Sequence, residues 1–273
     1  MQYYWSQVDN ASILPNTYPV GNVVSQVILG ESAVDGPALA ASTTALYLGW
    51  TGTDQRLNVS PNAVNFTGKT TLEERSLVGP ALAFAPIGGG RLFMAWAGTD
   101  ARLNVMSSLD ARSFAYKITL EERSSLTPSL TVASIGGGRL FLAWTGTDGR
   151  LNVMSSLDGV NFGYKMVLED RSNAGPTLCT VGSLLYLGFT GTDGRLNLLQ
   201  SADGLRFGNR VILEERSSTR PAALGGKVVD VNRSFAGPVL MTLGTTLYIA
   251  WTGTDTTRRL NLARVITTSL IPV

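Results

Sequence analysis

The sequence predicts an all-β fold, a single five-bladed β-propeller of four-stranded antiparallel blades that is closed by an N-terminal strand. A five-residue core, Trp-Thr-Gly-Thr-Asp at residues 50–54, recurs with small changes at residues 96–100, 144–148, 189–193 and 251–255. The aspartates of successive cores lie 46, 48, 45 and 62 residues apart in the numbering. A period of about 40–50 residues made of strand signals is typical of propeller blades, because each blade needs neighbours to bury its faces.

The composition fits a packed globular chain and excludes several kinds of chemistry. The chain has 273 residues, of which 44% are hydrophobic and 15% charged. A net charge of +2 predicts no nucleic-acid partner. No histidine is present, which excludes His-based catalysis and His metal ligation. The single cysteine, Cys179, lies in an apolar run and is expected to be a buried free thiol. We therefore predict no cofactor and no metal site.

Membrane and export signals are not evident in the sequence. No apolar run approaches the ~20 residues that span a membrane, so no membrane span is predicted. The first ten residues, MQYYWSQVDN, have neither a basic segment nor an apolar core, and are not expected to be a signal peptide. A secreted or extracellular location is favoured, reached without a signal peptide or represented here in mature form.

The third repeat shows the four strands of one blade, A to D from the inside outwards, most clearly. Strand A follows Pro128, and a Gly-Gly-Gly turn leads from it to strand B. Asp148-Gly149 is a hairpin signal between strands B and C, since Gly supplies the positive φ of a tight turn. Within strand C, Leu151 and Val153 share one face. The predicted strands are residues 129–135, 139–145, 150–155 and 164–168.

The turn between strands C and D carries a family resemblance. The pattern Ser156-x-Asp158-Gly159-x-x-Phe162 is repeated at residues 201–207 and, with Ala or Asn replacements, at 108–114 and 60–66. It resembles a shortened Asp-box, the turn of sialidase-like propellers, with one residue fewer between Asp and Gly. The resemblance implies a structural turn in which Asp accepts amide hydrogen bonds and the aromatic residue plugs the space between strands.

The two ends of the chain explain how a ring would close. Residues 24–30 align with the strand D segments of the repeats, while the C-terminal repeat lacks a recognisable strand D. We expect residues 24–30 to complete the fifth blade, which removes free sheet edges. Residues 1–22 then form an N-terminal arm, and residues 23–273 the propeller. The long fourth interval contains an inserted or duplicated hairpin at about residues 218–234, since KVVDVNRS there is similar to the strand D sequence KTTLEERS.

Blade topology sorts the polar residues onto two ends of the molecule. The B–C turns and D–A connections lie at one end, and the A–B and C–D turns at the other. The first end therefore collects the Thr-Gly-Thr-Asp cores and the Glu-Arg-Ser ends of strand D. A purely structural interpretation is favoured for both residue types. The aspartates would accept amide hydrogen bonds that stabilise the B–C turns, and the tryptophans would pack between blades. The aspartates are Asp54, Asp100, Asp148, Asp193 and Asp255.

The same end also fits a carbohydrate site. An aromatic ring beside a carboxylate and a guanidinium suits a sugar, whose apolar face stacks and whose hydroxyls form bidentate hydrogen bonds. We expect Trp96 and Trp144 to stack on the sugar. Arg123 and Arg171 are expected to donate hydrogen bonds to its hydroxyls, and Glu122 and Asp170 to accept them. The candidate residues are Trp50, Trp96, Trp144, Trp251, Glu74, Arg75, Glu122, Arg123, Asp170, Arg171, Glu215 and Arg216. Several weak sites of this kind would bind a glycan surface with avidity.

Five blades of about 47 residues with one site per blade resemble tachylectin-like propeller lectins in architecture. The resemblance implies a multivalent lectin, with glycans on a cell surface or glycoprotein as partners. Glycoside hydrolysis is not expected, because the predicted inner strands carry no acidic residue, so we predict that the chain is not an enzyme. The alternative is a protein-interaction propeller that docks a partner through one rim or through the arm at residues 1–22, which contains Tyr3, Tyr4 and Trp5.

Overall fold

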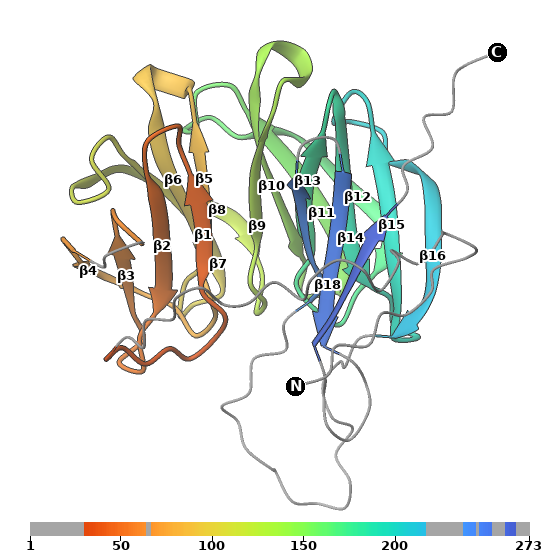
Figure 1. The fold of residues 1–273 in the computed structure, drawn as a ribbon, viewed down its shortest axis with the longest axis horizontal. Coiled ribbons are helices and arrows are strands. Elements are labelled where there is room, and N and C mark those ends of the chain that lie inside the picture. The colour runs from red at the N-terminus through yellow and green to blue at the C-terminus, as the bar shows by residue number, and fades with distance from the viewer. Residues whose placement is uncertain (1–29, 64–66, 217–236, 244–245, 253–259, 266–273) are drawn as a thin grey trace, which may run out of the picture.

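The computed structural model describes residues 30–63, 67–216, 237–243, 246–252 and 260–265. Within these ranges the chain forms nineteen β-strands, two short 3-10 helices and no α-helix. The strands make five antiparallel sheets that stand side by side (Figure 1). The all-β prediction is confirmed.

Each sheet is a run of consecutive strands, and we number the sheets in chain order. The first sheet contains β1 (Ala38–Ala41), β2 (Leu46–Thr51), β3 (Arg56–Ser60) and β4 (Thr70–Arg75). The second contains β5 (Ala81–Ala85), β6 (Arg91–Ala97), β7 (Arg102–Ser108) and β8 (Phe114–Arg123). The third contains β9 (Ser129–Ala133), β10 (Arg139–Thr145), β11 (Arg150–Ser156) and β12 (Gly163–Arg171). The fourth contains β13 (Thr177–Val181), β14 (Leu184–Thr190), β15 (Arg195–Ser201) and β16 (Gly208–Arg216). Of the fifth sheet, β17 (Val239–Leu243), β18 (Thr246–Thr252) and β19 (Leu260–Val265) are described.

The predicted four-stranded antiparallel unit is confirmed, with corrections to its inner and outer strands. The inner strand β9 ends at Ala133 and not at residue 135, because Ile135–Gly137 form a 3-10 helix. In the third sheet β10 has the predicted bounds, whereas β12 continues to Arg171 instead of ending at residue 168. The pairing of β11 with β12 shifts register between Arg150, which faces Arg171, and Asn152, which faces Val167. This bulge lets the outer strand stay paired further along. The Glu-Arg ends of strand D therefore lie in the sheet and not in a turn.

The apolar cores lie between neighbouring sheets. Leu140 and Trp144 of β10 pack in one cluster with Phe93 of the second sheet, while Phe141 packs in another with Leu187 of the fourth. Successive side chains of a strand point to opposite faces, so one strand contributes to both boundaries of its sheet. The inner strands β1, β5, β9, β13 and β17 lie next to one another in that order. This explains the continuous apolar sequence of strands such as LFLAWT.

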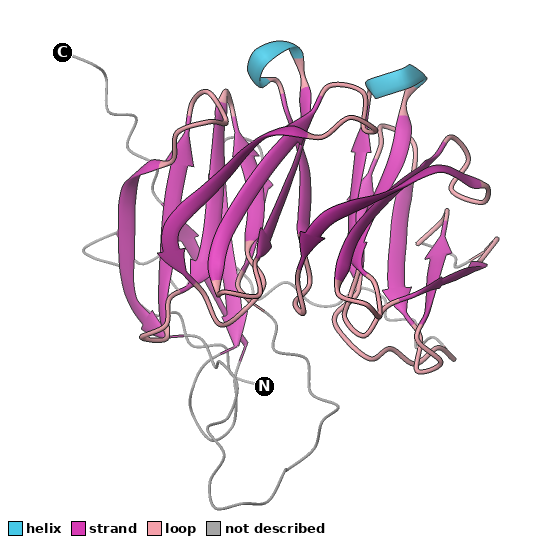
Figure 2. Ribbon diagram, turned by 180° about the vertical axis from the view of Figure 1, so that it is seen from behind, coloured by secondary structure: helices cyan, strands magenta, loops and turns pink. Residues whose placement is uncertain are grey.

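The two kinds of turn lie at opposite ends of the sheets. The 3-10 helices η1 (Ile87–Gly89) and η2 (Ile135–Gly137) join β5 to β6 and β9 to β10, and Figure 2 shows both at one end, which we call the upper end. The turns that join β2 to β3, and their equivalents in the other sheets, are at the opposite, lower end because the strands are antiparallel. The arm at residues 1–22, the closing strand up to residue 29 and the insertion at 218–234 lie outside the described residues.

Candidate functional site

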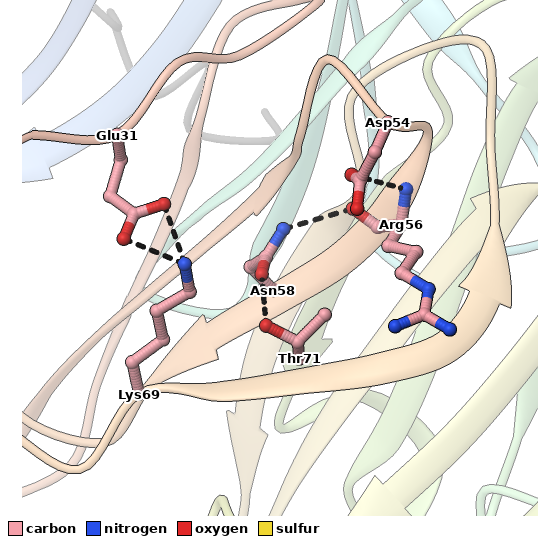
Figure 3. Close-up of polar contacts among 6 residues, drawn as sticks. All are labelled: Glu31, Asp54, Arg56, Asn58, Lys69 and Thr71. Carbon is pink, nitrogen blue, oxygen red and sulfur yellow. Dashed lines mark hydrogen bonds and ion pairs between the residues drawn. The ribbon is translucent and has the colours of Figure 1, made fainter.

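The Thr-Gly-Thr-Asp cores form tight turns at the lower end. In the first sheet Asp54 Oδ1 accepts the backbone N–H of Arg56 at 3.1 Å (Figure 3). The N–H of Gly52 donates to the Arg56 carbonyl at 2.8 Å. A Cβ at Gly52 would lie 2.7 Å from Asp54 Oδ1, so any larger residue there must displace this carboxylate. The equivalent aspartate bonds measure 3.0 Å at Asp100, Asp148 and Asp193. Each of these carboxylates is thus engaged in its own turn, while Asp255 lies outside the described residues.

The described tryptophans of the cores are buried, and Trp96 and Trp144 lie at boundaries between sheets. Trp50 is 3% exposed, and Trp96 and Trp144 are each 1% exposed. A lysine of the outer strand covers each ring: Lys69 Nζ is 5.4 Å from the centroid of Trp50, Lys117 Nζ 5.7 Å from Trp96, and Lys165 Nζ 5.8 Å from Trp144. In the fourth sheet Phe189 takes the place of Trp and Arg210 that of Lys, at 5.8 Å. The rings therefore present no surface on which a sugar stacks. Trp251 belongs to β18, and its side chain lies outside the described part.

The same cations join neighbouring sheets by ion pairs. Lys117 Nζ is 2.5 Å from Glu74 Oε2 of the first sheet, and Lys165 Nζ is 2.6 Å from Glu122 Oε2 of the second. Figure 3 shows the corresponding pair of Lys69 with Glu31, at 2.6 Å. In the fourth sheet Arg210 Nη1 is 2.7 Å from Asp170 Oδ1 of the third. All eight side chains are partly exposed, so each pair contributes about 0–1 kcal/mol.

The four exposed arginines at the ends of the outer strands bind the turns of their own sheets. Nη1 of Arg75 donates to the Asp54 carbonyl at 2.6 Å, and Nη1 of Arg123 to the Asp100 carbonyl at 2.7 Å. Arg171 donates in the same way to the carbonyl of Asp148, and Arg216 to that of Asp193. One nitrogen of each guanidinium is thereby held, while the group as a whole stays exposed.

This geometry changes how the candidate residues are grouped. Glu122 reaches forward to Lys165 of the third sheet, whereas its neighbour Arg123 binds the turn of the second sheet. Arg171 pairs with Arg150 on the neighbouring strand. Arg150 lies two residues before Asn152, and Asn152 pairs with Trp144. Paired residues of a sheet lie on one face. The boundary between the second and third sheets therefore combines Trp144, Lys165 and Arg171 with Glu122. Glu122 and Arg123, although adjacent in the sequence, therefore belong to different boundaries. The side chain of Glu215 lies outside the description.

Further polar bonds support the face that carries each tryptophan. Asn58 Nδ2 donates to the Arg56 carbonyl at 3.0 Å, and Thr71 Oγ1 donates to Asn58 Oδ1 at 2.7 Å (Figure 3). Asn104 and Thr119 repeat the second bond at 2.7 Å in the second sheet. Arg56 Nη2 also lies 2.8 Å from the highly exposed Glu73. In the first and second sheets these bonds fix the outer strand against its neighbour.

The C–D turns at the upper end are stabilised by their aspartates. Asp158 Oδ1 accepts the backbone N–H groups of Asn161 and Val160 at 2.7 and 2.9 Å, and these bonds together with the Asn161 side chain lower its pKa. Backbone N–H groups of Ser113 and Arg112, and then the Ser108 hydroxyl, lower the pKa of Asp110 to about 2. In both cases hydrogen bonds stabilise the charged form. Gly159 lies directly against Phe93 of the second sheet, so a side chain at this position has no room.

The structure also places one carboxylate that the sequence analysis did not single out. Asp35 Oδ2 accepts the backbone N–H of Gly79 at 2.9 Å and the hydroxyl of Thr127 at 2.8 Å. It thereby links the connections that enter the first three sheets. The sequence signal for this role is a departure from the repeat. Asp35 precedes a Gly-Pro pair, whereas the residue before Gly-Pro in other repeats is apolar, Val78 or Ala174.

No metal centre or membrane helix is found in the part of the chain that the structure describes. Three or more His, Cys, Asp or Glu side chains do not come together there in a way that holds a metal ion. Helices long and apolar enough to cross a membrane are likewise missing from those residues. Cys179 is buried, as predicted, and burial raises the pKa of its thiol.

Comparison with known proteins identifies the fold. No protein-family model matches the sequence, and no curated protein matches it. Among solved structures, the SapL1 lectin in complex with α-methyl fucoside matches with a TM-score of 0.55 and 10% identity, over 84% of this chain and 76% of that chain. The fungal lectin of Aleuria aurantia, a six-bladed β-propeller, matches with a TM-score of 0.54 and 10% identity, over 87% of this chain and 76% of that one. At such identities the likeness shows the fold alone, and that fold is a β-propeller.

Enzymes share this fold, which corrects one expectation. The sialidase of Trypanosoma rangeli matches with a TM-score of 0.51 and 13% identity, over 83% of this chain but 44% of the sialidase. A GH43 protein of Bacillus licheniformis matches with a TM-score of 0.50 and 12% identity, over 88% of this chain and 54% of that protein. The prediction that the chain is not an enzyme is overturned by these neighbours, because the fold is used by enzymes and lectins alike.

Proposed function

We propose that this chain is a five-bladed propeller that binds carbohydrate at several equivalent sites, one at each boundary between neighbouring sheets. The observation that carries the proposal is the recurrence of one polar arrangement. At three successive boundaries a partly exposed cation pairs with a carboxylate of the preceding sheet, and an exposed arginine lies on the same sheet face as the cation. Such an arrangement, repeated with little change, suits one small ligand bound many times.

The boundary between the second and third sheets illustrates the chemistry. A sugar hydroxyl both donates and accepts hydrogen bonds, and here Glu122 supplies an acceptor while Lys165 and Arg171 supply donors. Nη1 of Arg171 is already held by the carbonyl of Asp148, which orients the guanidinium before a ligand arrives. Hydrogen bonds to charged groups are the stronger ones, so a few of them suffice for a weak site.

The tryptophans have an indirect role in this proposal. Trp144 is buried beneath Lys165 and holds that ammonium group by a cation–π contact. Phe189 fills the same position in the fourth sheet. The proposed sites therefore use Glu74, Glu122 and Asp170 with Arg123, Arg171 and Arg216, and the aromatic rings position the cations between them.

The fold gives this proposal further support. Two structural neighbours with TM-scores above 0.5 are lectins, one of them in complex with α-methyl fucoside. A multivalent lectin needs equivalent sites that face the same way, and a propeller supplies them by repetition.

The test is a pair of variants in which equal numbers of exposed arginines are removed. We expect Arg123→Ala with Arg171→Ala to weaken glycan binding by about tenfold or more, because two charge-assisted hydrogen bonds are lost. The matched control, Arg112→Ala with Arg206→Ala, removes exposed arginines next to the C–D turns and is expected to bind as the wild type does. Unchanged affinity of the first variant for a glycan that the wild type binds would refute the assignment.

A further inference from the structure

The residue before each of four cations has an unusual backbone conformation. The cations are those that cover the core aromatic rings, Lys69, Lys117, Lys165 and Arg210. The residues before them are Gly68, Tyr116, Tyr164 and Asn209, with φ angles of 74°, 54°, 50° and 48°. Glycine and asparagine are the residues expected at positive φ, whereas a bulky aromatic residue is strained there. Tyr116 and Tyr164 thus adopt a backbone conformation for which the first and fourth sheets have glycine and asparagine, the residues better suited to it.

Each of these tyrosines forms a cation–π contact with an arginine. Cζ of Arg91 lies 5.0 Å from the ring centroid of Tyr116, and Cζ of Arg139 lies 4.7 Å from that of Tyr164. The tyrosines are 62% and 64% exposed. Each pair therefore offers solvent a large aromatic surface beside a guanidinium.

The arginines come from the upper end of the molecule. Arg91 and Arg139 begin β6 and β10, directly after the Gly-rich turns that contain η1 and η2. Figure 2 shows these turns at the end opposite to the Thr-Gly-Thr-Asp turns. The tyrosine–arginine pairs thus differ in residues and in chemistry from the boundary sites proposed above.

The two members of a pair occur together. The second and third sheets have both the tyrosine and the arginine. The first sheet has Gly68 with Ala45 in the arginine's place, and the fourth has Asn209 with Leu184. The outer strand and the positive-φ position before the cation therefore form without a tyrosine–arginine pair. Among the described residues, no carboxylate forms an ion pair with Arg91 or Arg139, whereas Arg56, Arg102, Arg150, Arg195 and Arg210 each have one.

From these observations we infer that Tyr116 with Arg91, and Tyr164 with Arg139, are two equivalent binding sites for a pyranose that carries a carboxylate. The ring of the sugar stacks on the exposed tyrosine surface, and its carboxylate forms a bidentate pair with the guanidinium. Each tyrosine combines this positive φ with a contact to an arginine, and strained backbone of this kind is typical of binding sites. This inference does not rest on the proposed function, because it uses none of the same residues.

The test compares methyl glucuronide with methyl glucoside, which differ only in a carboxylate in place of a hydroxymethyl group. Calorimetry and ligand-observed NMR on the full chain should show binding of the glucuronide, at least tenfold tighter than that of the glucoside. Tyr116→Asn with Tyr164→Asn, which copies the residue of the fourth sheet, should abolish binding and leave the Tm unchanged or higher, because asparagine tolerates positive φ. Arg91→Gln with Arg139→Gln should remove the preference for the acid.

The variant that tests the boundary sites is the control. Arg123→Ala with Arg171→Ala should bind the glucuronide as tightly as the wild type, whatever its effect on other glycans. Three results would overturn the inference: no glucuronide binding by the wild type, unchanged binding by the folded Tyr→Asn variant, or loss of binding in the Arg123 and Arg171 variant. The last result would assign the acid to the boundary sites.

Discussion

At the scale of the residue, one repeated feature is a cation that covers a buried aromatic ring. Lys165 contacts Trp144 through its ammonium group and pairs with Glu122 of the preceding sheet. Burial of the ring removes a large apolar area from water, whereas the ion pair is partly exposed and screened. The ring is therefore the dominant contributor to stability, and the cation contributes mainly to the polar surface.

The difference between the buried ring and the exposed ion pair predicts different effects on stability for substitutions of Trp144 and Lys165. Trp144→Ala should cost about 3–5 kcal/mol of unfolding free energy, because it leaves a cavity between two sheets. Lys165→Met keeps the apolar stem and should cost about 1 kcal/mol or less. Urea denaturation of both variants measures the difference. If Lys165→Met lowered the free energy of unfolding as much as Trp144→Ala does, the ion pair would contribute far more to stability than expected.

The C–D turn aspartates predict loss of stability in acid. Asp110 has a pKa of about 2 in the fold against an ordinary value of 3.8, because it accepts N–H groups of Ser113 and Arg112. The folded state therefore binds fewer protons than the unfolded chain between these values. The stabilisation is fully present above about pH 4 and is lost as the pH falls toward 2. NMR titration of the Asp110 carboxyl checks this, and a midpoint near 4 would contradict it.

At the scale of the element, the tight turn at the start of each third strand depends on a glycine with no free space around it. A Cβ at Gly146 would lie 2.8 Å from Asp148 Oδ1 and 3.1 Å from Asn152 Nδ2. Both side chains make hydrogen bonds that hold the turn. Any substitution must displace at least one of them.

We therefore expect Gly146→Ala to destabilise the protein by about 1–3 kcal/mol. Gly163→Ala is the matched control, since a Cβ at Gly163 has no atom within 4 Å and its backbone is not in the left-handed region. Thermal unfolding should show a lower Tm for the first variant and little change for the second. Equal Tm values would mean that the turn adjusts freely.

The elements themselves were largely predictable, because apolar alternation, Gly-rich turns and a repeated core sequence agree within each repeat. The bounds of β10 match the prediction, and β12 is longer because a bulge continues its pairing to Arg171. Side-chain partners across sheets were not predictable in this way. Lys165 and Glu122 are 43 residues apart, about one repeat, so their contact depends on how sheets pack and not on any local pattern. For the same reason Trp144 was assigned a stacking role, although it faces the neighbouring sheet.

At the scale of the whole molecule, the sheets are joined through their inner strands and through one long-range carboxylate. Asp35 bonds to Gly79 and to Thr127, 44 and 92 residues further along the chain. It therefore ties together the connections of three sheets that are otherwise held by apolar packing.

Replacing Asp35 with Ala should leave the Gly79 N–H without this acceptor and cost about 1–3 kcal/mol. Hydrogen exchange should show faster exchange of the Gly79 amide in the variant, with amides of the fourth sheet as an internal reference. Unaltered exchange at Gly79 would show that Asp35 does not contribute to holding the sheets together.

The central claim is that the repeated boundaries bind carbohydrate, and the most direct measurement is a glycan-array screen of the full chain followed by calorimetric stoichiometry on the best ligand. We expect binding with several equivalent sites per chain, because the same charged arrangement is present at three described boundaries. A folded protein that binds no glycan on the array, or one that binds a single equivalent per chain, would contradict it.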